Sequence, residues 1–207
     1  MDSGAFTEIS THGHYRHSVS EYALEIRRWS TNGNLLAAVA QDYMCEPFII
    51  EKTGLSVPEH QRLTVERYDA LMAEDTAGVY ILPVLQGFAP SDYVDHIRMY
   101  GDRLTQGMWV GVGSVCKRNG TPDAVAAVLL AIKRERPDLR LHGFGLKTTA
   151  LAHPLARSLL ETADSMAWSF QARISGRNGN DWREAVRWTK NIESRPVQYL
   201  LQLEQLQ

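Results

Sequence analysis

A single acid, Asp164, stands in a largely apolar stretch near the end of the chain, Thr162–Phe170. A carboxylate in such a run is costly to bury as an anion unless another group pairs with it or the protein uses it chemically. The structural alternative is a strand-end Asp that caps a turn. Our hypothesis is that Asp164 is a nucleophile at the mouth of a barrel, and the rest of the chain must position it there.

Polar residues follow the other predicted strands in the same way. They are Asp2, Asp42, Gln86, Ser114 and Lys147, and they are accompanied by Gly4, Gly87, Gly113 and Gly145. The carboxyl ends of strands hold the active site of a parallel α/β barrel, and glycine there lets a flat ligand approach the backbone. Each residue alone is a weak indication, because loops are polar everywhere. Together they predict a pocket of carboxylates, an amide and bare backbone, which suits a purine-like base.

Short apolar runs alternate with helical patterns through most of the chain. The runs predicted as strands are residues 35–40, 79–85, 108–113 and 139–145, with a last one before Asp164. The turn after Met1 is typical of the exit of a further strand. Apolar strands that alternate with helices predict a parallel sheet, either a closed barrel or a doubly wound open sheet. No Gly-x-Gly-x-x-Gly motif follows a strand, which argues against a dinucleotide site.

Helix boundaries are indicated by capping residues and prolines. The predicted helix starts are three capping boxes (Ser18 with Glu21, Ser56 with Glu59, Asp181 with Glu184), Ser91, and Thr121 with Pro122. One helix is predicted through Leu151 and Leu160. Pro137 ends the helix before it, and Pro196 is predicted to break the C-terminal helical region in two.

The composition is that of an ordinary globular protein, with 207 residues, 44% hydrophobic and 22% charged. We predict a single domain over residues 1–207, with about 175–207 as a C-terminal helical extension. The formal net charge of −2 means that nucleic-acid binding requires a local basic patch. Two cysteines cannot form a disulfide framework, and no apolar run is long enough for a membrane helix. We therefore expect a cytoplasmic protein with no membrane partner.

Three histidines lie close together at His12, His14 and His17. Metal binding there is one interpretation, and a polar loop rich in histidine is the more common case. No carboxylate or cysteine stands beside them at ligand spacing, so we predict no metal site.

Short motifs along the chain resemble those of tRNA-guanine transglycosylases. They are Asp2-Ser3-Gly4-Ala5-Phe6, Val84-Leu85-Gln86-Gly87, Gly111-Val112-Gly113-Ser114, Gly143-Phe144-Gly145-Leu146-Lys147, and the stretch from Asp164 to Arg173. Their order and spacing match along roughly the first 175 residues. Within this superfamily the chain is similar to the shortened transglycosylase-like proteins of phages and bacteria that place 7-deazaguanines in DNA.

The resemblance implies a TIM-type (β/α)8 barrel and base exchange at a nucleotide, in DNA by preference or in tRNA. Asp164 would attack C1′ and form a covalent glycosyl-enzyme, and Asp2 would be the general acid/base. A 7-deazaguanine such as preQ0 or preQ1 would replace guanine, and no cofactor is implied. The chemistry is sound by itself, because a glycosidic bond breaks through an oxocarbenium-like state that a carboxylate can stabilise and trap. A second acid then protonates the departing base.

The resemblance also assigns the substrate-binding residues. Asp42, Gln86 and the Gly113 backbone would read the edge of the base. The other motif residues at the site would be Ser3, Gly4, Gly87, Ser114, Gly145 and Lys147. Asp42 stands one position away from the family's base-reading Asp when Cys45 and Pro47 are aligned with the family pattern.

Two features of the family have no counterpart in the sequence. One is the zinc site with its cysteine cluster after the last strand, so we expect packing alone to hold the C-terminal region. The other is the set of initial strands, which would lie before Met1. The expected barrel is therefore shortened at its N-terminus, and it is open or completed by a second copy or a partner subunit.

Basic residues cluster after Asp164, at Arg173, Arg177, Arg183, Arg187 and Lys190. Helical spacing places the last three near one face. A solvated helix face is one interpretation, and a patch for the phosphates of the nucleic acid is the other.

Other functions remain open at this stage. A transglycosylase paralogue without activity could bind nucleic acid or a partner subunit, which the missing strands and zinc site would favour. A hydrolase with a carboxylate pair is a third, weaker alternative.

Overall fold

The computed structural model describes residues 1–118 and 120–194 of the chain. Strands and helices alternate along it. The strands are β1 Ala37–Val39, β2 Tyr80–Leu82, β3 Val84–Leu85, β4 Trp109–Val112, β5 Arg140–Gly143 and β6 Thr162–Ala163. The helices are α1 Ala5–His12, α2 Val19–Asn32, α3 Pro47–Thr53, α4 Val57–Met72, α5 Pro90–Tyr100, α6 Pro122–Glu135, α7 Thr148–Leu151, α8 Pro154–Leu159, α9 Ala167–Ile174 and α10 Trp182–Glu193. Two 3-10 turns, η1 Gly101–Arg103 and η2 Cys116–Arg118, complete the elements. Pro196 and its predicted break lie outside the described residues.

The strands form a parallel series in chain order. β1 pairs with β2, and the second sheet has the order β3-β4-β5-β6. Only Pro83 separates β2 from β3, so one predicted strand, residues 79–85, serves both sheets. Proline has no N–H to donate to a ladder, which explains the interruption. The prediction of parallel sheets is confirmed.

Met1 lies beside β1 as a further parallel strand would. Its amino group donates a hydrogen bond to the Ala37 carbonyl (2.6 Å), and the Val39 N–H donates to the Met1 carbonyl (2.9 Å). Asp2 therefore leaves the sheet at the same edge as the other strand exits.

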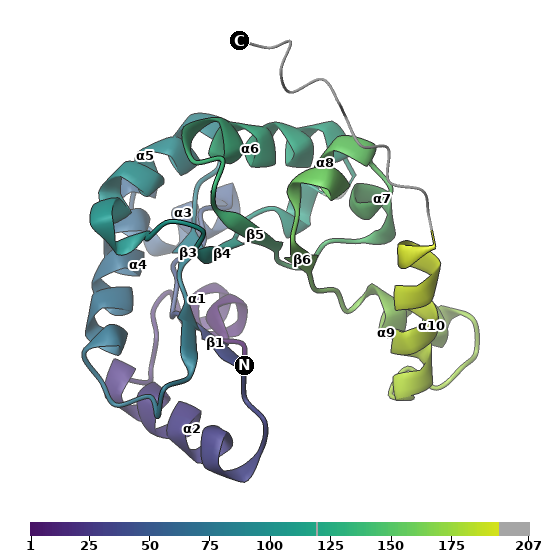
Figure 1. The fold of residues 1–207 in the computed structure, drawn as a ribbon, viewed down its shortest axis with the longest axis horizontal. Coiled ribbons are helices and arrows are strands. Elements are labelled where there is room, and N and C mark those ends of the chain that lie inside the picture. The colour runs from purple at the N-terminus through teal and green to yellow at the C-terminus, as the bar shows by residue number, and fades with distance from the viewer. Residues whose placement is uncertain (119, 195–207) are drawn as a thin grey trace.

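The helices cover the outside of the strand series. Figure 1 shows α2, α4, α5, α6 and α8 following one another around the strands. Val125, Val128, Leu129 and Ile132 recur at helical spacing in α6, and all four are fully buried. Burial of each such side chain contributes roughly 1.5–3 kcal/mol. Within the described ranges no backbone hydrogen bond joins β6 to β1, so a closed barrel remains a prediction.

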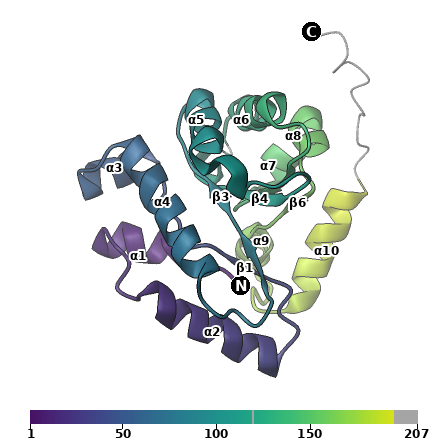
Figure 2. The ribbon, with the colours of Figure 1, turned by 60° about the vertical axis from the view of Figure 1, so that its left-hand side comes forward.

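A second, smaller hydrophobic cluster lies under α1 and α3, which pack together (Figure 2). It consists of Ala5, Ile9, Tyr15, Tyr43, Met44 and Ile49. The sequence pattern missed α1, α3 and α9, which are only 7 or 8 residues long. Such short helices depend on tertiary packing, because isolated helices of this length are not stable.

Two of the predicted capping boxes are confirmed and one is wrong. The Ser18–Glu21 and Ser56–Glu59 pairs make the reciprocal bonds of a capping box. At α10 the Asp181 carboxylate does accept the Arg183 N–H (3.0 Å). Glu184, however, binds the guanidinium groups of Arg177 and Arg187 instead of the backbone. The Glu184 carboxylate forms stronger hydrogen bonds with charged guanidinium groups than with a neutral peptide N–H.

Two other helix predictions need correction. α5 begins at Pro90, one residue before Ser91, and the Asp92 carboxylate accepts the N–H groups of Phe88 (2.8 Å) and Ala89 (2.7 Å). The single helix predicted through Leu151 and Leu160 is divided into α7 and α8. Pro154 begins α8, and a proline ring cannot continue the preceding helix.

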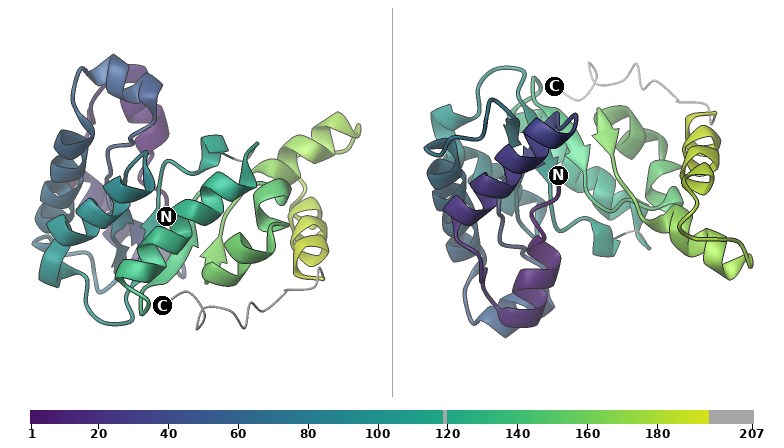
Figure 3. Two further views of the ribbon diagram at one scale, coloured as in Figure 1. Left: turned by 90° about the horizontal axis from the view of Figure 1, so that it is seen from above. Right: turned by 90° about the horizontal axis from the view of Figure 1, so that it is seen from below.

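The α9–α10 pair lies at the end of the molecule far from α2 and α4, as Figures 1 and 3 show. The Trp188 indole N–H donates to Thr148 Oγ1 (3.1 Å), and Ile192 joins the main core. None of the helices in the described part of the chain has both the length and the apolar character needed to cross a membrane.

Candidate active site

A cavity of about 600 Å³ lies at the carboxyl ends of the strands. The residues from the predicted site that line it are Asp2, Asp42, Gln86, Gly113, Ser114, Gly145 and Asp164. These residues follow successive strands, from the Met1 segment at one end of the strand series to β6 at the other end. The predicted carboxylates and amide therefore lie around one cavity.

A buried chain of hydrogen bonds runs across the cavity wall. Gln86 Nε2 donates to Asp42 Oδ2, and the Ser114 hydroxyl contacts Gln86 Oε1 (2.7 Å) and Glu46 Oε2 (2.9 Å). All four side chains are at most 6% exposed. The Ser114 hydroxyl has one proton, so it donates to only one of these acceptors at a time. Two carboxylates are thereby held at opposite ends of an amide and a hydroxyl.

Ser114 has a backbone conformation that few residues other than glycine adopt, with φ at +54°. Its hydroxyl also accepts a hydrogen bond from the Cys45 N–H (2.9 Å). Strain of this kind costs of order 1–3 kcal/mol and persists where the surroundings enforce it. The bonds to the hydroxyl hold Ser114 in place and direct it toward Glu46 and Gln86.

The charge of Asp42 is sensitive to pH near neutrality. Burial raises the pKa of Asp42 to about 7; the Gln86 hydrogen bond opposes this rise, and the nearby carboxylates of Asp2 and Glu46 add to it. At neutral pH the Asp42 carboxyl is therefore present in both forms, so it can accept a hydrogen bond or donate one.

We predict that Asp42→Asn gains stability relative to the wild type as pH rises. The pKa of Asp42 in the folded protein lies above its unfolded value of 3.8, so the folded state of the wild type binds this proton more tightly than the unfolded state. The stability that Asp42 contributes to the wild type is therefore complete below pH 3.8 and is lost as pH rises through about 7. Between pH 5 and pH 8 the difference in unfolding free energy should move in favour of the variant by roughly 2–3 kcal/mol. Urea unfolding at the two pH values measures it. If the difference in unfolding free energy is the same at both pH values, the pKa of Asp42 is not raised.

Gly113 makes room for the side chain of Gln86. A Cβ atom at position 113 would lie 2.1 Å from Gln86 Nε2 and 2.6 Å from its Cδ. The sequence pattern predicts that strand-end glycines admit a ligand, but a protein side chain fills the space at Gly113. The same is true of Gly87, whose Cβ would meet Asp92 and Tyr93.

We predict that Gly113→Ala displaces Gln86 and breaks the bonds to Asp42 and Ser114. Gln86 is 1% exposed and cannot swing into solvent, so overpacking should cost roughly 1–3 kcal/mol. Thermal unfolding measures the stability, and base binding should weaken with it. Gly120→Ala is the matched control, because nothing lies within 4 Å of its Cβ position. Equal melting temperatures for the two variants would contradict the prediction.

Asp164 directly follows β6, as predicted for a strand exit, but it is not buried. Its side chain is 57% exposed toward the cavity. Oδ1 accepts the Gly145 N–H (2.8 Å) and lies 3.6 Å from His142 Nε2. Burial raises the pKa of Asp164, but the nearby His142 side chain and the hydrogen bond from the Gly145 N–H outweigh it, so the pKa lies below its usual value. The group is a carboxylate at neutral pH.

His142 is held in place by β6 and β4. Its Nδ1 lies 2.8 Å from Thr162 Oγ1, which also accepts the Trp109 indole N–H (3.0 Å). A Thr162 hydroxyl that donates to Nδ1 leaves the ring proton on Nε2, on the side of Asp164. The imidazole edge also packs against the Phe144 ring, with centroids 4.7 Å apart.

Sequence reasoning missed Glu46 and His142 as members of the site. Glu46 follows the same strand exit as Asp42, and its spacing to Asp42 was a signal that could have been used. His142 precedes the glycine of a recognised motif, but its role depends on β6 lying alongside β5. Only the paired strands bring it to Asp164.

Several predicted site residues do not line this cavity. They are Ser3, Gly4, Gly87 and Lys147. Ser3 still contacts the site, because its hydroxyl lies 3.5 Å from Asp42 Oδ1. Gly4 precedes α1 with φ at +74°, and Lys147 precedes α7.

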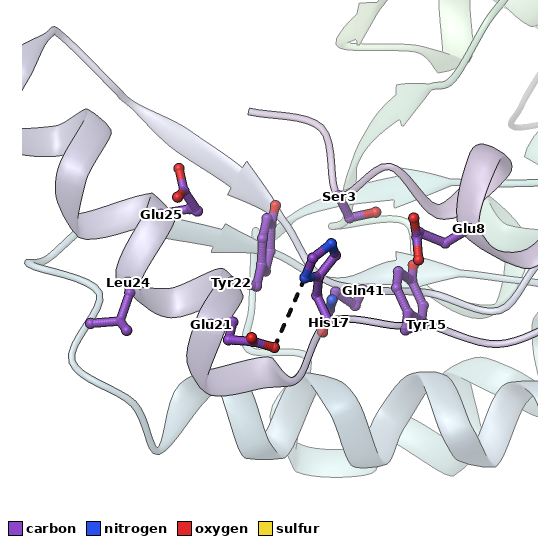
Figure 4. A pocket seen from close by; sticks show the side chains of 9 residues that line it. All are labelled: Ser3, Glu8, Tyr15, His17, Glu21, Tyr22, Leu24, Glu25 and Gln41. Atoms are coloured by element: carbon purple, nitrogen blue, oxygen red, sulfur yellow. Dashed lines mark ion pairs between the residues drawn. The ribbon is translucent and has the colours of Figure 1, made fainter.

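Ser3 lines a second cavity of about 460 Å³ between α1 and α2 (Figure 4). Glu8, Glu21 and Glu25 give it an acidic character, which does not suit a nucleic acid. Two of these carboxylates have structural partners: Glu8 binds Arg16 (2.7 Å), and Glu21 caps α2. We assign no function to this cavity.

The predicted basic cluster is exposed but partly neutralised. Arg177 and Arg187 share the Glu184 carboxylate, and Arg183 lies 3.4 Å from Asp181. Arg173 donates to Ser169 Oγ (3.0 Å), and Lys190 lies on the exposed side of α10. Ion pairs reduce the charge available for phosphates, so a role of this cluster in DNA binding stays a prediction.

No group of three or more His, Cys, Asp or Glu side chains in residues 1–118 and 120–194 is arranged to hold a metal ion. His12 ends α1, and Gly13 caps it in the left-handed conformation.

In α/β proteins the ligand site commonly lies at the carboxyl ends of consecutive parallel strands, where this cavity is found. The chain belongs to the DeoxyPurine in DNA protein A (DpdA) family, whose family model matches residues 1–195. This is a 7-deazaguanine DNA-modification family related to tRNA-guanine transglycosylases, and it acts on DNA. Membership indicates a transglycosylase-type enzyme of DNA modification. No curated protein matches the sequence.

Proposed function

We propose that the chain exchanges guanine in DNA for a 7-deazaguanine such as preQ0 or preQ1. The observation that carries this proposal is that Asp2 and Asp164 line one cavity together with a buried wall of donors and acceptors. A volume of about 600 Å³ is adequate for a nucleoside, since ligand sites occupy about 300–1,000 Å³.

The buried wall is suited to the edge of a guanine-type base. That edge has N–H donors beside a carbonyl acceptor. Asp42 and Glu46 supply acceptors, and the Gln86 amide supplies both a donor and an acceptor. A base that enters must replace some of the bonds within the wall, so a base lacking the matching groups would leave buried polar atoms unpaired.

In the first half of the reaction an Asp164 oxygen bonds to C1′ and the bond from C1′ to N9 of guanine breaks. The Gly145 N–H and His142 both hold Oδ1, so we assign the attack to Oδ2. The lowered pKa keeps Asp164 ionised for this step. Asp2 donates the proton that lets guanine leave as a neutral base.

In the second half the 7-deazaguanine occupies the position that guanine has left. Asp2, now a carboxylate, takes the proton from N9 of the incoming base. N9 bonds to C1′, and the bond to Asp164 breaks. Both acids return to their starting state, so the cycle needs no external oxidant, reductant or cofactor.

The test is incorporation of labelled preQ0 into DNA, measured together with release of guanine and with a covalent DNA–protein adduct on denaturing gels. Equal amounts of base released and incorporated support exchange. Base release without incorporation would identify a hydrolase, and binding without either product would identify a paralogue without activity.

The complete (β/α)8-type barrel belongs to the same proposal. Consecutive parallel strands with helices outside them are the arrangement of that fold. A second copy of the chain or a partner subunit would complete the barrel. Light scattering of the protein with and without DNA reports its molar mass, and a monomer that is fully active would exclude such a partner.

A further inference from the structure

A groove of about 540 Å³ lies beside the active-site cavity. It is lined by Glu46, Pro47, Phe48, Phe88, Lys117 and Arg118. Phe48 and Phe88 are large aromatic side chains that are 44% and 42% exposed. They come from α3 and from the loop after β3, and the two cations come from η2. Three separate segments thus converge on one aromatic and cationic surface.

The cations of this groove lie over aromatic rings. The Arg118 guanidinium is 4.5 Å from the centre of the Phe88 ring, and Lys117 Nζ is 5.8 Å from that of Phe48. In the described part of the chain neither cation forms an ion pair with a carboxylate. This differs from the arginines of the α10 region, which bind Glu184 and Asp181. The positive charges of Lys117 and Arg118 are therefore available to an anionic ligand.

The groove is continuous with the active-site cavity. Glu46 lines both of them, with its carboxylate bound to Ser114 in the wall of the active site. Lys117 Nζ also lies 5.2 Å from the centre of the Phe6 ring, and Phe6 lines the active-site cavity. A strand that places one nucleotide in the cavity would therefore reach the groove with the next.

We infer that the groove binds a nucleotide adjacent to the exchanged one in an unpaired DNA strand, with its base on Phe48 and Phe88 and its phosphate at Lys117 and Arg118. This inference rests on the proposed function, because it takes the DNA strand as the ligand of the cavity. A base reaches an aromatic side chain only after it has left the stack of a duplex, whereas a phosphate is accessible in both forms. Exposed rings beside cations that form no ion pair with a carboxylate in the described part of the chain thus select a single strand or a locally opened duplex.

The first test is the affinity of the full chain for a fluorescent single-stranded oligonucleotide and for its blunt duplex. The Asp164→Asn background prevents a covalent complex. Phe48→Ala and Phe88→Ala should each weaken single-strand binding by roughly 5- to 100-fold, and Phe48→Tyr and Phe88→Tyr should restore it. Phe170→Ala, which removes a more exposed ring (64%) on α9, should have no such effect.

The second test separates the cations from the rings. Lys117→Ala with Arg118→Ala should reduce the slope of log K against log salt concentration by about 0.7, because the two cations neutralise one phosphate and each phosphate of a single strand contributes about 0.7. Arg134→Ala, an exposed cation near the end of α6, should leave the slope unchanged.

The outcomes distinguish this inference from the proposed function. In one outcome the wild type exchanges bases normally while single-strand binding is unchanged in the variants of Phe48, Phe88, Lys117 and Arg118. That result overturns the inference that the groove binds DNA and leaves the proposed base exchange intact. Groove-dependent DNA binding without base exchange by the wild type overturns the proposed reaction and supports the groove. Tighter binding to the blunt duplex than to the single strand overturns the requirement for an unpaired nucleotide.

Discussion

Asp164→Asn should abolish base exchange, with a loss of at least roughly a thousandfold. Asparagine has the same shape, but it carries no charge and cannot form the glycosyl ester with C1′. Its side-chain oxygen can still accept the Gly145 N–H, so the local structure should be retained. Incorporation of labelled preQ0 and the covalent DNA–protein adduct are the two measurements, and both should disappear.

The fold of the Asp164→Asn variant should be unaffected. The side chain is 57% exposed, and exposed substitutions usually change stability by less than about 0.5 kcal/mol. Asp102→Asn, an exposed acid in η1, is the matched control and should keep full activity. Wild-type incorporation by Asp164→Asn would remove Asp164 from the reaction, whatever the other results.

Asp2→Asn should lower the exchange rate by roughly 10²- to 10⁴-fold, because the departing guanine loses its proton donor. Asp2 is exposed beside β1, so the loss should not come from unfolding. Single-turnover measurements of adduct formation report the first half of the reaction. They should show slow adduct formation with a normal yield of folded protein.

A substrate with a better leaving group separates the two acids. DNA containing N7-methylguanine carries a base that is already cationic and leaves without protonation. Adduct formation on this DNA should recover in Asp2→Asn and remain absent in Asp164→Asn. A slow reaction of Asp2→Asn on both substrates would instead give Asp2 a role in positioning the substrate.

The buried carboxylates that form the wall of the cavity also affect the stability of the protein. Asp42 and Glu46 are buried close to each other, and their repulsion contributes to the raised pKa of Asp42. This arrangement costs stability at high pH, as the Asp42→Asn prediction states. Strain at Ser114 and like charges at Asp42 are features that proteins retain at functional sites.

The order of the elements and most of the strand exits could be predicted from the sequence. Apolar runs locate β1, β4 and β5 to within a few residues, because a strand buried on both faces needs an uninterrupted apolar segment. Capping pairs locate the starts of α2 and α4, because a helix start must satisfy its own N–H groups with nearby side chains. The short helices α1, α3 and α9 could not be predicted, since their stability comes from neighbours distant in the sequence.

The sequence by itself determined which polar residues follow the strands, and therefore that Asp2, Asp42, Gln86, Ser114 and Asp164 gather at one edge of a parallel sheet. These are local properties, set by the alternation of apolar runs and turns. Only the tertiary structure decided that Asp164 is exposed, that His142 lies beside it, and that Gln86 fills the space over Gly113. Glu46 joined the site for the same reason. Such contacts depend on strand pairing and on side-chain packing between segments far apart in the chain, which no local pattern encodes.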